Sequence, residues 1–397
     1  MDNRTFVGER LKDARLLRGK TLQELADLTG ISKQSLSLYE NKKNIPDLQR
    51  VFAIASALKV PYEFFVHEDG CKTKTEVTYF RSLSTATKTS RTAQSLKLEY
   101  VAKMYKALLE YVDFPMLNLP TFDFIGCDDE NDENGMVQME EEIEQIAAAV
   151  RQLWGIDDGP IENLQYLMEE NGIIVTGFDV GEKIDAFSQR TITEYGDVFM
   201  VALEQGETPE GRFRFNICHE LGHILMHPWS ETMDSLSKEE FRMRERQANM
   251  FASAFLLQKE TFAKDVALYP TDLSYYVVLK KKWKSSIQSM IMRSHQLKII
   301  TDNQYQYMMR QVSKKGWRTC EPGDHPYYLQ ENIFQGAIDL LLDENVLSVK
   351  GLMDLFDKYG VSLYPVEIEE YLHLRKDTLK DTSPAKSKII QLKRKDD

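Results

Sequence analysis

The sequence has little of what a membrane protein or a disulfide-linked secreted protein needs. No run of its 397 residues approaches the roughly 18 apolar residues that cross a bilayer. Its N-terminus is charged throughout and lacks the apolar stretch of a signal peptide. The four cysteines (Cys71, Cys127, Cys218 and Cys320) include no C-x-x-C pair, which argues against a disulfide framework and a thiolate zinc site. We therefore expect a cytoplasmic protein with no membrane partner.

Basic residues are scarce overall but not at the N-terminal end. The formal net charge is −12, yet residues 1–66 hold 11 Lys and Arg against 8 Asp and Glu, a net of +3. The remaining residues carry a net of −15. Because DNA is a polyanion, only the N-terminal segment is suited to meet nucleic acid. The length of the chain predicts two or three domains.

The hydrophobic pattern divides the chain into four regions. Residues 1–66 predict five short helices, the third capped by Ser32. Residues 67–137 are predicted to be a linker with an amphipathic helix and an acidic loop. Residues 138–325 mix helices with two strands, IIVTGFDV and DVFMVALE, on either side of IDAFSQRT. Residues 326–397 predict a small helical appendix with a basic polar tail. The predicted fold is mainly α with a small β-sheet.

The stretch ICHELGHILMH carries the strongest chemical signal. On a helix, His219 and His223 project from one face and can converge on one ion. Glu220, rotated roughly 100° from His219, can reach a metal-bound water without ligating the metal. This arrangement suits hydrolysis assisted by Zn²⁺, in which the ion acidifies water and the carboxylate transfers its proton. The pattern arises by chance in about one such chain in a hundred, so a third ligand is needed.

A second helix, RERQANMFASAFLLQ, supplies that ligand. Its apolar residues from Ala248 to Leu256 recur at helical spacing and define a buried stripe, on which Glu245 also lies. An ionised carboxylate facing a core costs several kcal/mol unless a cation meets it, and zinc is such a cation. Asn249, one turn on, is placed to hydrogen-bond a ligand histidine.

Two other readings of these segments stay open. The histidines could be core residues satisfied by hydrogen bonds, with Glu245 paired to Arg242 or Arg246. His227 could be a ligand in place of Glu245, although Pro228 after it disfavours helix there and places His227 at the helix end.

The two segments together resemble the ImmA/IrrE family of zinc metallopeptidases, in which an H-E-x-x-H helix is followed by E-x-x-x-N. The likeness extends through IENLQYLMEENGIIVTG and DAFS upstream and to Glu321-Pro322 downstream. It implies a zincin-like α+β domain that binds Zn²⁺. The implied roles are metal ligand for His219, His223 and Glu245, general base for Glu220, and a position behind a ligand for Asn249. Many family members have Glu where this chain has Gln247.

The stretch TLQELADLTGISKQSLSLYENKKNIPDLQRVFAIASAL resembles the Xre/Cro type of helix-turn-helix domain. The resemblance implies that the third helix enters the major groove of double-stranded operator DNA. Base-edge contacts would come from Lys33, Gln34, Ser35 and Leu38, and phosphate contacts from Ser32, Lys42 and Lys43. The small positive charge suggests a homodimer on a two-part site. A helical bundle used only for dimerisation is the alternative.

Together, the resemblances imply a DNA-binding transcriptional regulator with a zinc endopeptidase domain. The family likeness suggests that the peptidase cleaves a partner protein, a helix-turn-helix repressor or an antitoxin, in a stress- or phage-related response. A non-proteolytic regulator whose peptidase-like domain senses a metal or small ligand is the alternative, and a toxin–antitoxin component in one chain is a third. Retention of Glu220 favours the enzyme, because a sensor does not need the base.

Overall fold

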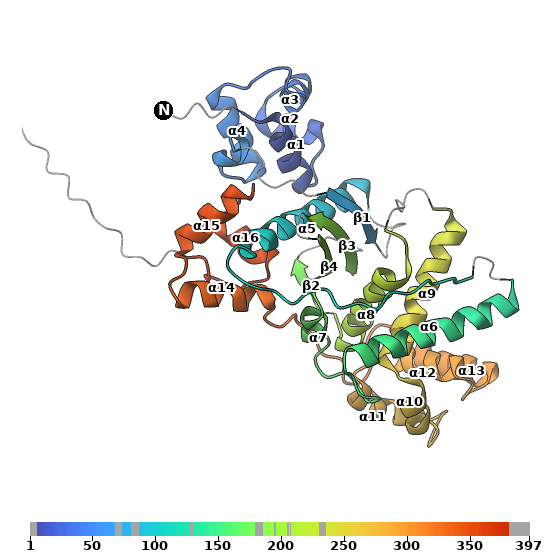
Figure 1. The fold of residues 1–397 in the computed structure, drawn as a ribbon. Helices are drawn as coiled ribbons and strands as arrows, with labels where there is room; N and C mark the ends of the chain where they lie inside the picture. Colours follow the sequence, from blue (N-terminus) through green and yellow to red (C-terminus); the bar gives the residue numbers. More distant parts are fainter. Residues whose placement is uncertain are drawn as a thin grey trace, which may run out of the picture.

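A small twisted sheet lies between two layers of helices in the computed structural model (Figure 1). The structure describes residues 6–67, 74–80, 87–127, 131–178, 186–193, 196–204, 206, 208–229 and 236–380. The basic tail and part of the acidic loop lie outside these residues. None of the described helices is long and apolar enough to span a bilayer.

The N-terminal region forms helices α1 (Gly8–Leu17), α2 (Leu22–Thr29), α3 (Lys33–Glu40) and α4 (Leu48–Leu58), followed by a 3₁₀ turn at Tyr62–Phe65. Ser32 caps α3 as predicted, because its hydroxyl accepts the backbone N–H of Ser35 at 3.2 Å. The fifth predicted helix is only this 3₁₀ turn. It places Phe64 and Phe65, both fully buried, in the core of the domain within a single turn.

The described part of the sheet has four strands in the order β1-β3-β4-β2. They are β1 (Lys74–Phe80), β2 (Ile173–Phe178), β3 (Ala186–Thr193) and β4 (Gly196–Glu204). β2 and β4 pair in parallel, whereas β3 pairs antiparallel with β4 on one side and with β1 on the other. Strands β2 and β4 were predicted. β3 was not, because its buried side chains include the polar residues Ser188, Gln189 and Thr191, which give no apolar pattern.

The region predicted to be a linker, residues 67–137, contains a strand and a long helix. Its first part supplies strand β1, and its helix α5 (Lys88–Leu108) lies against α1, the sheet and the C-terminal helices. Leu98, Val101 and Met104 of α5 are fully buried. The amphipathic helix predicted in this segment is present as α5. Its sequence pattern shows that one face is buried but not how many neighbours surround the helix.

Two cores lie on opposite faces of the sheet. Along β4, Phe199, Val201 and Leu203 belong to one core, and the alternating residues Val198, Met200 and Ala202 belong to the other, as the two-residue period of a strand requires. The first core is covered by α6 (Glu133–Leu153), α7 (Leu164–Glu170), α8 (Glu210–Met226), α9 (Lys238–Leu256), α10 (Lys259–Val266), α11 (Leu273–Trp283), α12 (Ile287–Gln296) and α13 (Asp302–Lys314). The second joins α5 to the N-terminal helices and to α14 (Ile333–Asp343), α15 (Val349–Lys358) and α16 (Pro365–Tyr371).

The buried guanidinium of Arg10 attaches the N-terminal helices to the rest of the chain. It donates to the Phe64 carbonyl at 3.0 Å, to the Tyr100 hydroxyl of α5 at 3.2 Å and to the Gly360 carbonyl at 2.7 Å. A buried charge must be satisfied on all sides, and three acceptors from three segments do so here. The N-terminal helices are therefore docked on α5 and on the C-terminal region.

Candidate metal centre and DNA-facing helix

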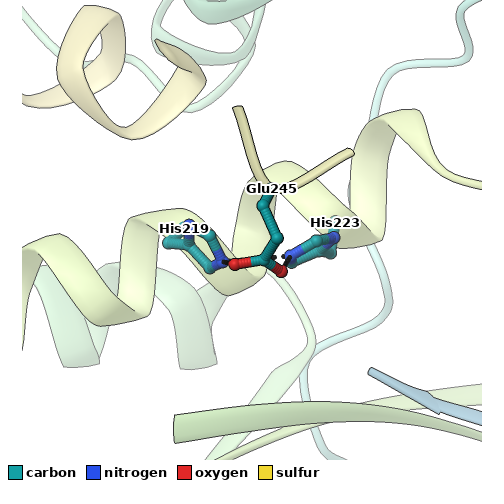
Figure 2. Close-up of side chains that lie close together, drawn as sticks. All are labelled: His219, His223 and Glu245. Atoms are coloured by element: carbon teal, nitrogen blue, oxygen red, sulfur yellow. Dashed lines mark hydrogen bonds and ion pairs between the residues drawn. The ribbon is translucent and has the colours of Figure 1, made fainter. Parts of the chain in front are cut away.

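Helices α8 and α9 approach closely at the candidate metal centre. A side chain at Gly222 would place its Cβ 3.1 Å from the Cα of Ala248 and 3.2 Å from the ring of Phe251. Only residues without bulk at the crossing permit this distance. The close crossing brings the histidine face of α8 under Glu245 of α9, as Figure 2 shows.

The three predicted ligands lie together in the structure. The Nε2 atoms of His219 and His223 are 3.0 Å apart, and they lie 3.6 Å and 3.3 Å from the two carboxylate oxygens of Glu245 (Figure 2). Ligand atoms on a tetrahedral zinc ion, each at about 2.0–2.1 Å from the metal, are separated by about 3.3 Å. The printed separations between the two imidazole nitrogens and the carboxylate oxygens are therefore close to those of neighbouring ligand atoms on one zinc ion.

The hydrogen bonds behind the histidines turn their lone pairs toward Glu245. His219 Nδ1 lies 3.0 Å from Asn249 Oδ1, and since this oxygen can only accept, Nδ1 carries the hydrogen. In a neutral imidazole, Nε2 then presents a lone pair to the cluster. Lone pairs and a carboxylate converging on one point repel one another unless a cation lies between them, so these residues fit a divalent metal.

His227 lies behind His223 and points away from the cluster. At the C-terminal cap of α8, its Nδ1 is 2.7 Å from Nδ1 of His223 and its Nε2 is 3.0 Å from Oε1 of Gln247. Burial lowers the pKa of His227 well below its ordinary value, and a proton on His223 would lower it further. The neutral ring donates to Gln247 and accepts from His223, so Nε2 of His223 is also left with a lone pair. The side chain of His227 therefore orients the ring of His223, a role that the sequence pattern did not indicate.

Glu245 is ionised at every physiological pH. Burial on its own would raise the pKa of this carboxyl, but protons on His219 and His223, which take the place of a cation between the three side chains, outweigh burial and lower it to about 2. The arginine pairing considered as an alternative does not form. Arg242 contacts Glu239 at 3.2 Å, and Arg246 lies 4.0 Å from Glu140.

Glu220, the predicted base, is fully buried next to the sheet. Its Oε2 accepts a hydrogen bond from the hydroxyl of Ser188 in β3 at 2.6 Å. The sequence analysis did not single out Ser188, although this residue ends the DAFS stretch that carries part of the family likeness. The bond fixes the carboxylate plane beside the histidines.

Helix α3 presents most of the predicted DNA contacts to solvent. Ser32, Lys33, Gln34, Leu38, Lys42 and Lys43 are exposed. Ser35 is half-buried, and its hydroxyl lies 2.9 Å from that of Ser32. Lys42 also forms an exposed ion pair with Glu9 at 2.9 Å, a contact of little energy that a phosphate could replace. In Figure 1, α3 lies at the outer end of the N-terminal helices, away from the sheet.

The fold and the site thus define a two-part protein, with a helix-turn-helix domain at the N-terminus and an α+β domain that carries a His-His-Glu cluster. Comparison with known families agrees with both parts. Residues 11–65 match the helix-turn-helix family, and residues 172–295 match the IrrE N-terminal-like domain, which includes the cluster and Glu220. The chain therefore combines a helix-turn-helix domain of the DNA-binding type with an IrrE/ImmA-like domain.

Two curated relatives share only the N-terminal part. The HTH-type transcriptional regulator SutR of Escherichia coli (strain K12) is 36% identical over 61 residues, which are 15% of this chain and 34% of SutR. The SPbeta prophage-derived HTH-type transcriptional regulator YonR of Bacillus subtilis (strain 168) is 37% identical over 61 residues, 15% of this chain and 56% of YonR. The chain thus spans about a third and about half of the lengths of these relatives.

Proposed function

We propose that the protein is a DNA-binding transcriptional regulator whose IrrE/ImmA-like domain is a zinc endopeptidase. The proposed substrate is a partner regulatory protein, a helix-turn-helix repressor or antitoxin, cleaved in a stress- or phage-related response. The observation that carries the proposal is the convergence of His219, His223 and Glu245 within 3.0–3.6 Å, with Glu220 beside them. A metal ligand set alone would fit a structural site, but a buried carboxylate next to it is what hydrolysis requires.

In this proposal His219, His223 and Glu245 hold Zn²⁺. When bound, the ion would supply Lewis acidity toward a peptide carbonyl and lower the pKa of a water molecule. Glu220 accepts the proton of the attacking water and passes it to the leaving nitrogen. Ser188 holds Oε2 of Glu220, so that Oε1 exchanges the proton. His227 and Asn249 keep the ligand imidazoles in the tautomer that offers Nε2.

At the other end of the chain, α3 reads an operator, and a homodimer places two such helices on a two-part site. Support comes from the exposed polar face of α3 and from the names of the two relatives, both described as HTH-type transcriptional regulators. The helix-turn-helix domain would regulate the protein's own operon or bring the peptidase to a substrate that binds nearby DNA.

The variant Glu220→Gln tests the enzymatic part. It keeps the size of the side chain and the acceptor for Ser188 but removes the base. We expect it to retain zinc and its melting temperature while losing cleavage of the partner protein by at least about 100-fold. Equal cleavage by this variant and the wild type would contradict the mechanism.

A second function, a non-proteolytic sensor, is favoured by one observation. His219 and Glu220 are 0% exposed and His223 is 1% exposed, so a polypeptide has no access to them in this conformation. A sensor would bind the metal and change its affinity for DNA without cutting. Operator affinity that responds to zinc equally in wild type and Glu220→Gln, with no cleavage by either, would establish this alternative.

A further inference from the structure

Strand β1 pairs with the side of β3 that β4 leaves open, next to the candidate active site. β1 is the end strand of the described sheet, and it pairs antiparallel with β3 so that Tyr79 lies opposite Ser188. Ser188 is the residue whose hydroxyl holds Glu220. Neighbouring strands lie about 4.8 Å apart, so the backbone of β1 passes one strand spacing from the residue that contacts the proposed base.

An extended substrate segment would need this same position. Peptides commonly bind a folded domain by adding a strand to an exposed sheet edge, where the backbone supplies the hydrogen bonds. The other side of β3 is taken by β4, which pairs with it along the whole strand. The edge beside Ser188 is therefore the place where a partner can add a strand next to Glu220, and β1 already fills it.

The origin of β1 separates it from the peptidase-like domain. β1 spans residues 74–80, outside the 172–295 match to the IrrE N-terminal-like domain. It comes from the segment between the helix-turn-helix domain and α5. β3 and β4, by contrast, belong to the matched domain. The strand that covers the edge is thus an addition from the regulatory end of the chain.

Besides its pairing with β3, β1 has described side-chain hydrogen bonds through Thr78, whose hydroxyl lies 3.0 Å from that of Ser95 in α5. The Thr78 hydroxyl donates to the buried Oε1 of Gln189 at 2.8 Å, and the Ser95 hydroxyl of α5 donates to the same oxygen at 2.8 Å. Gln189 keeps its bond to Ser95 if β1 leaves. The pairing of β1 with β3 is also irregular, with a shift in register between Thr75 and Val77.

We infer that β1 is an internal competitor for the substrate edge, and that an extended segment of the partner protein replaces it antiparallel to β3. This inference rests on the proposed endopeptidase function. A tethered strand competes at an effective concentration of about 1 mM or more, so a free peptide binds poorly until β1 is released.

The first test uses the full chain with Glu220→Gln, so that binding is measured without cleavage. The probe is a fluorescein-labelled peptide with the sequence of residues 74–80, KTEVTYF, followed by fluorescence anisotropy. Thr78→Pro removes the Gln189 contact and a backbone N–H from β1. Thr92→Ala is the matched control, since the hydroxyl of this threonine of α5 donates to the Lys88 carbonyl of the same helix. We expect at least tenfold tighter binding to Thr78→Pro than to Thr92→Ala or the parent. Equal affinities in folded proteins would overturn the inference.

A second variant covers the case in which Thr78→Pro does not fold. Val77→Cys with Arg190→Cys places two cysteines opposite each other on β1 and β3. We expect the oxidised form not to cleave the partner, and tris(2-carboxyethyl)phosphine to restore cleavage. In the Glu220→Gln background, the oxidised form should bind the probe more weakly than the reduced form. Oxidised and reduced forms that behave alike would overturn the inference. Probe binding that follows the state of β1 without any cleavage would leave the inference standing and contradict only the proposed peptidase.

Discussion

Ser188 and Glu220, 32 residues apart in sequence, are joined by a hydrogen bond of 2.6 Å between two fully buried side chains. The bond connects β3 to α8 beside His219 of the His-His-Glu cluster. It makes the sheet a support for the proposed base, because the carboxylate can keep its orientation only while β3 stays in register with the helix.

Ser188→Ala should therefore reduce catalysis without removing the metal. Loss of a hydrogen bond that positions a group at a metal site costs about 10–100-fold in activity. We expect kcat for cleavage of the partner protein to fall by about tenfold, with KM and bound zinc unchanged. Ser253→Ala, a buried serine of α9 that bonds Gln296 rather than Glu220, is the matched control. A KM effect or loss of zinc would show that Ser188 acts structurally.

The contact between His227 and Gln247 should tune zinc affinity. Gln247→Glu puts a carboxylate where the amide oxygen now accepts from His227, which makes His227 a stronger acceptor for His223 and His223 a stronger ligand. We expect tighter zinc binding in competition with a chelator. His227→Phe removes the contact and should weaken zinc binding about 10–100-fold. Unchanged affinity in both variants would contradict the orienting role of His227.

Glu169 should make the stability depend on pH. Burial raises the pKa of this carboxyl to about 8, from an ordinary value of 4.5, although Gln165 and the Ile333 N–H partly oppose the shift. Between these two pH values the folded state holds a proton that the unfolded state releases. The free energy of unfolding therefore falls as pH rises from 4.5 toward 8, by at most about 1.4 kcal/mol per pH unit.

Glu169→Gln should remove this slope, giving a higher melting temperature than wild type at pH 8 and a similar one at pH 5. Glu170→Gln, at the exposed neighbouring position, is the control and should leave the slope unchanged. Thermal unfolding followed by circular dichroism across this range measures both variants. A slope that persists in Glu169→Gln would show that other groups cause it.

Substitutions in α3 and in the turn after it should affect DNA binding in two different ways. On an operator selected from random DNA, Gln34→Ala should reduce the binding free energy by about 1–3 kcal/mol and relax the base preference at one base pair. Lys43→Gln should weaken binding to all DNA sequences alike and reduce the slope of log affinity against log salt concentration by about 1. Lys59→Gln is the control. This exposed lysine is the C-cap of α4, and its carbonyl accepts from Arg18, which also pairs with Glu367 of the C-terminal region. Equal losses in all three would argue against recognition by α3.

Most of the His-His-Glu cluster could be predicted because its parts are local. His219 and His223 are brought together by one helical turn. Glu245 could be recognised because it is a charged residue on the apolar stripe of its helix. Ser188, His227 and Gln247 could not be assigned in the same way. Their contacts join residues 20 or more positions apart or lie at a helix end, and polar residues give no periodic signal for such contacts.

The helices of the fold were more predictable than its sheet. Capping residues and a 3.6-residue hydrophobic period indicate helices in a sequence, as Ser32 and α3 illustrate. β1 and β3 are held by hydrogen bonds among Thr78, Ser95 and Gln189, three polar residues from distant segments. A pattern of this kind looks like a loop until the tertiary contacts are known, which explains why β1 was assigned to a linker.

The central claim is that His219, His223 and Glu245 form a zinc site. The most direct test is metal analysis of the purified wild-type protein beside His223→Ala, by inductively coupled plasma mass spectrometry after dialysis. Wild type should retain about one zinc ion per chain, and His223→Ala should retain almost none while keeping its helical circular dichroism. Wild-type protein without zinc, or a variant that holds as much zinc as wild type, would contradict the claim.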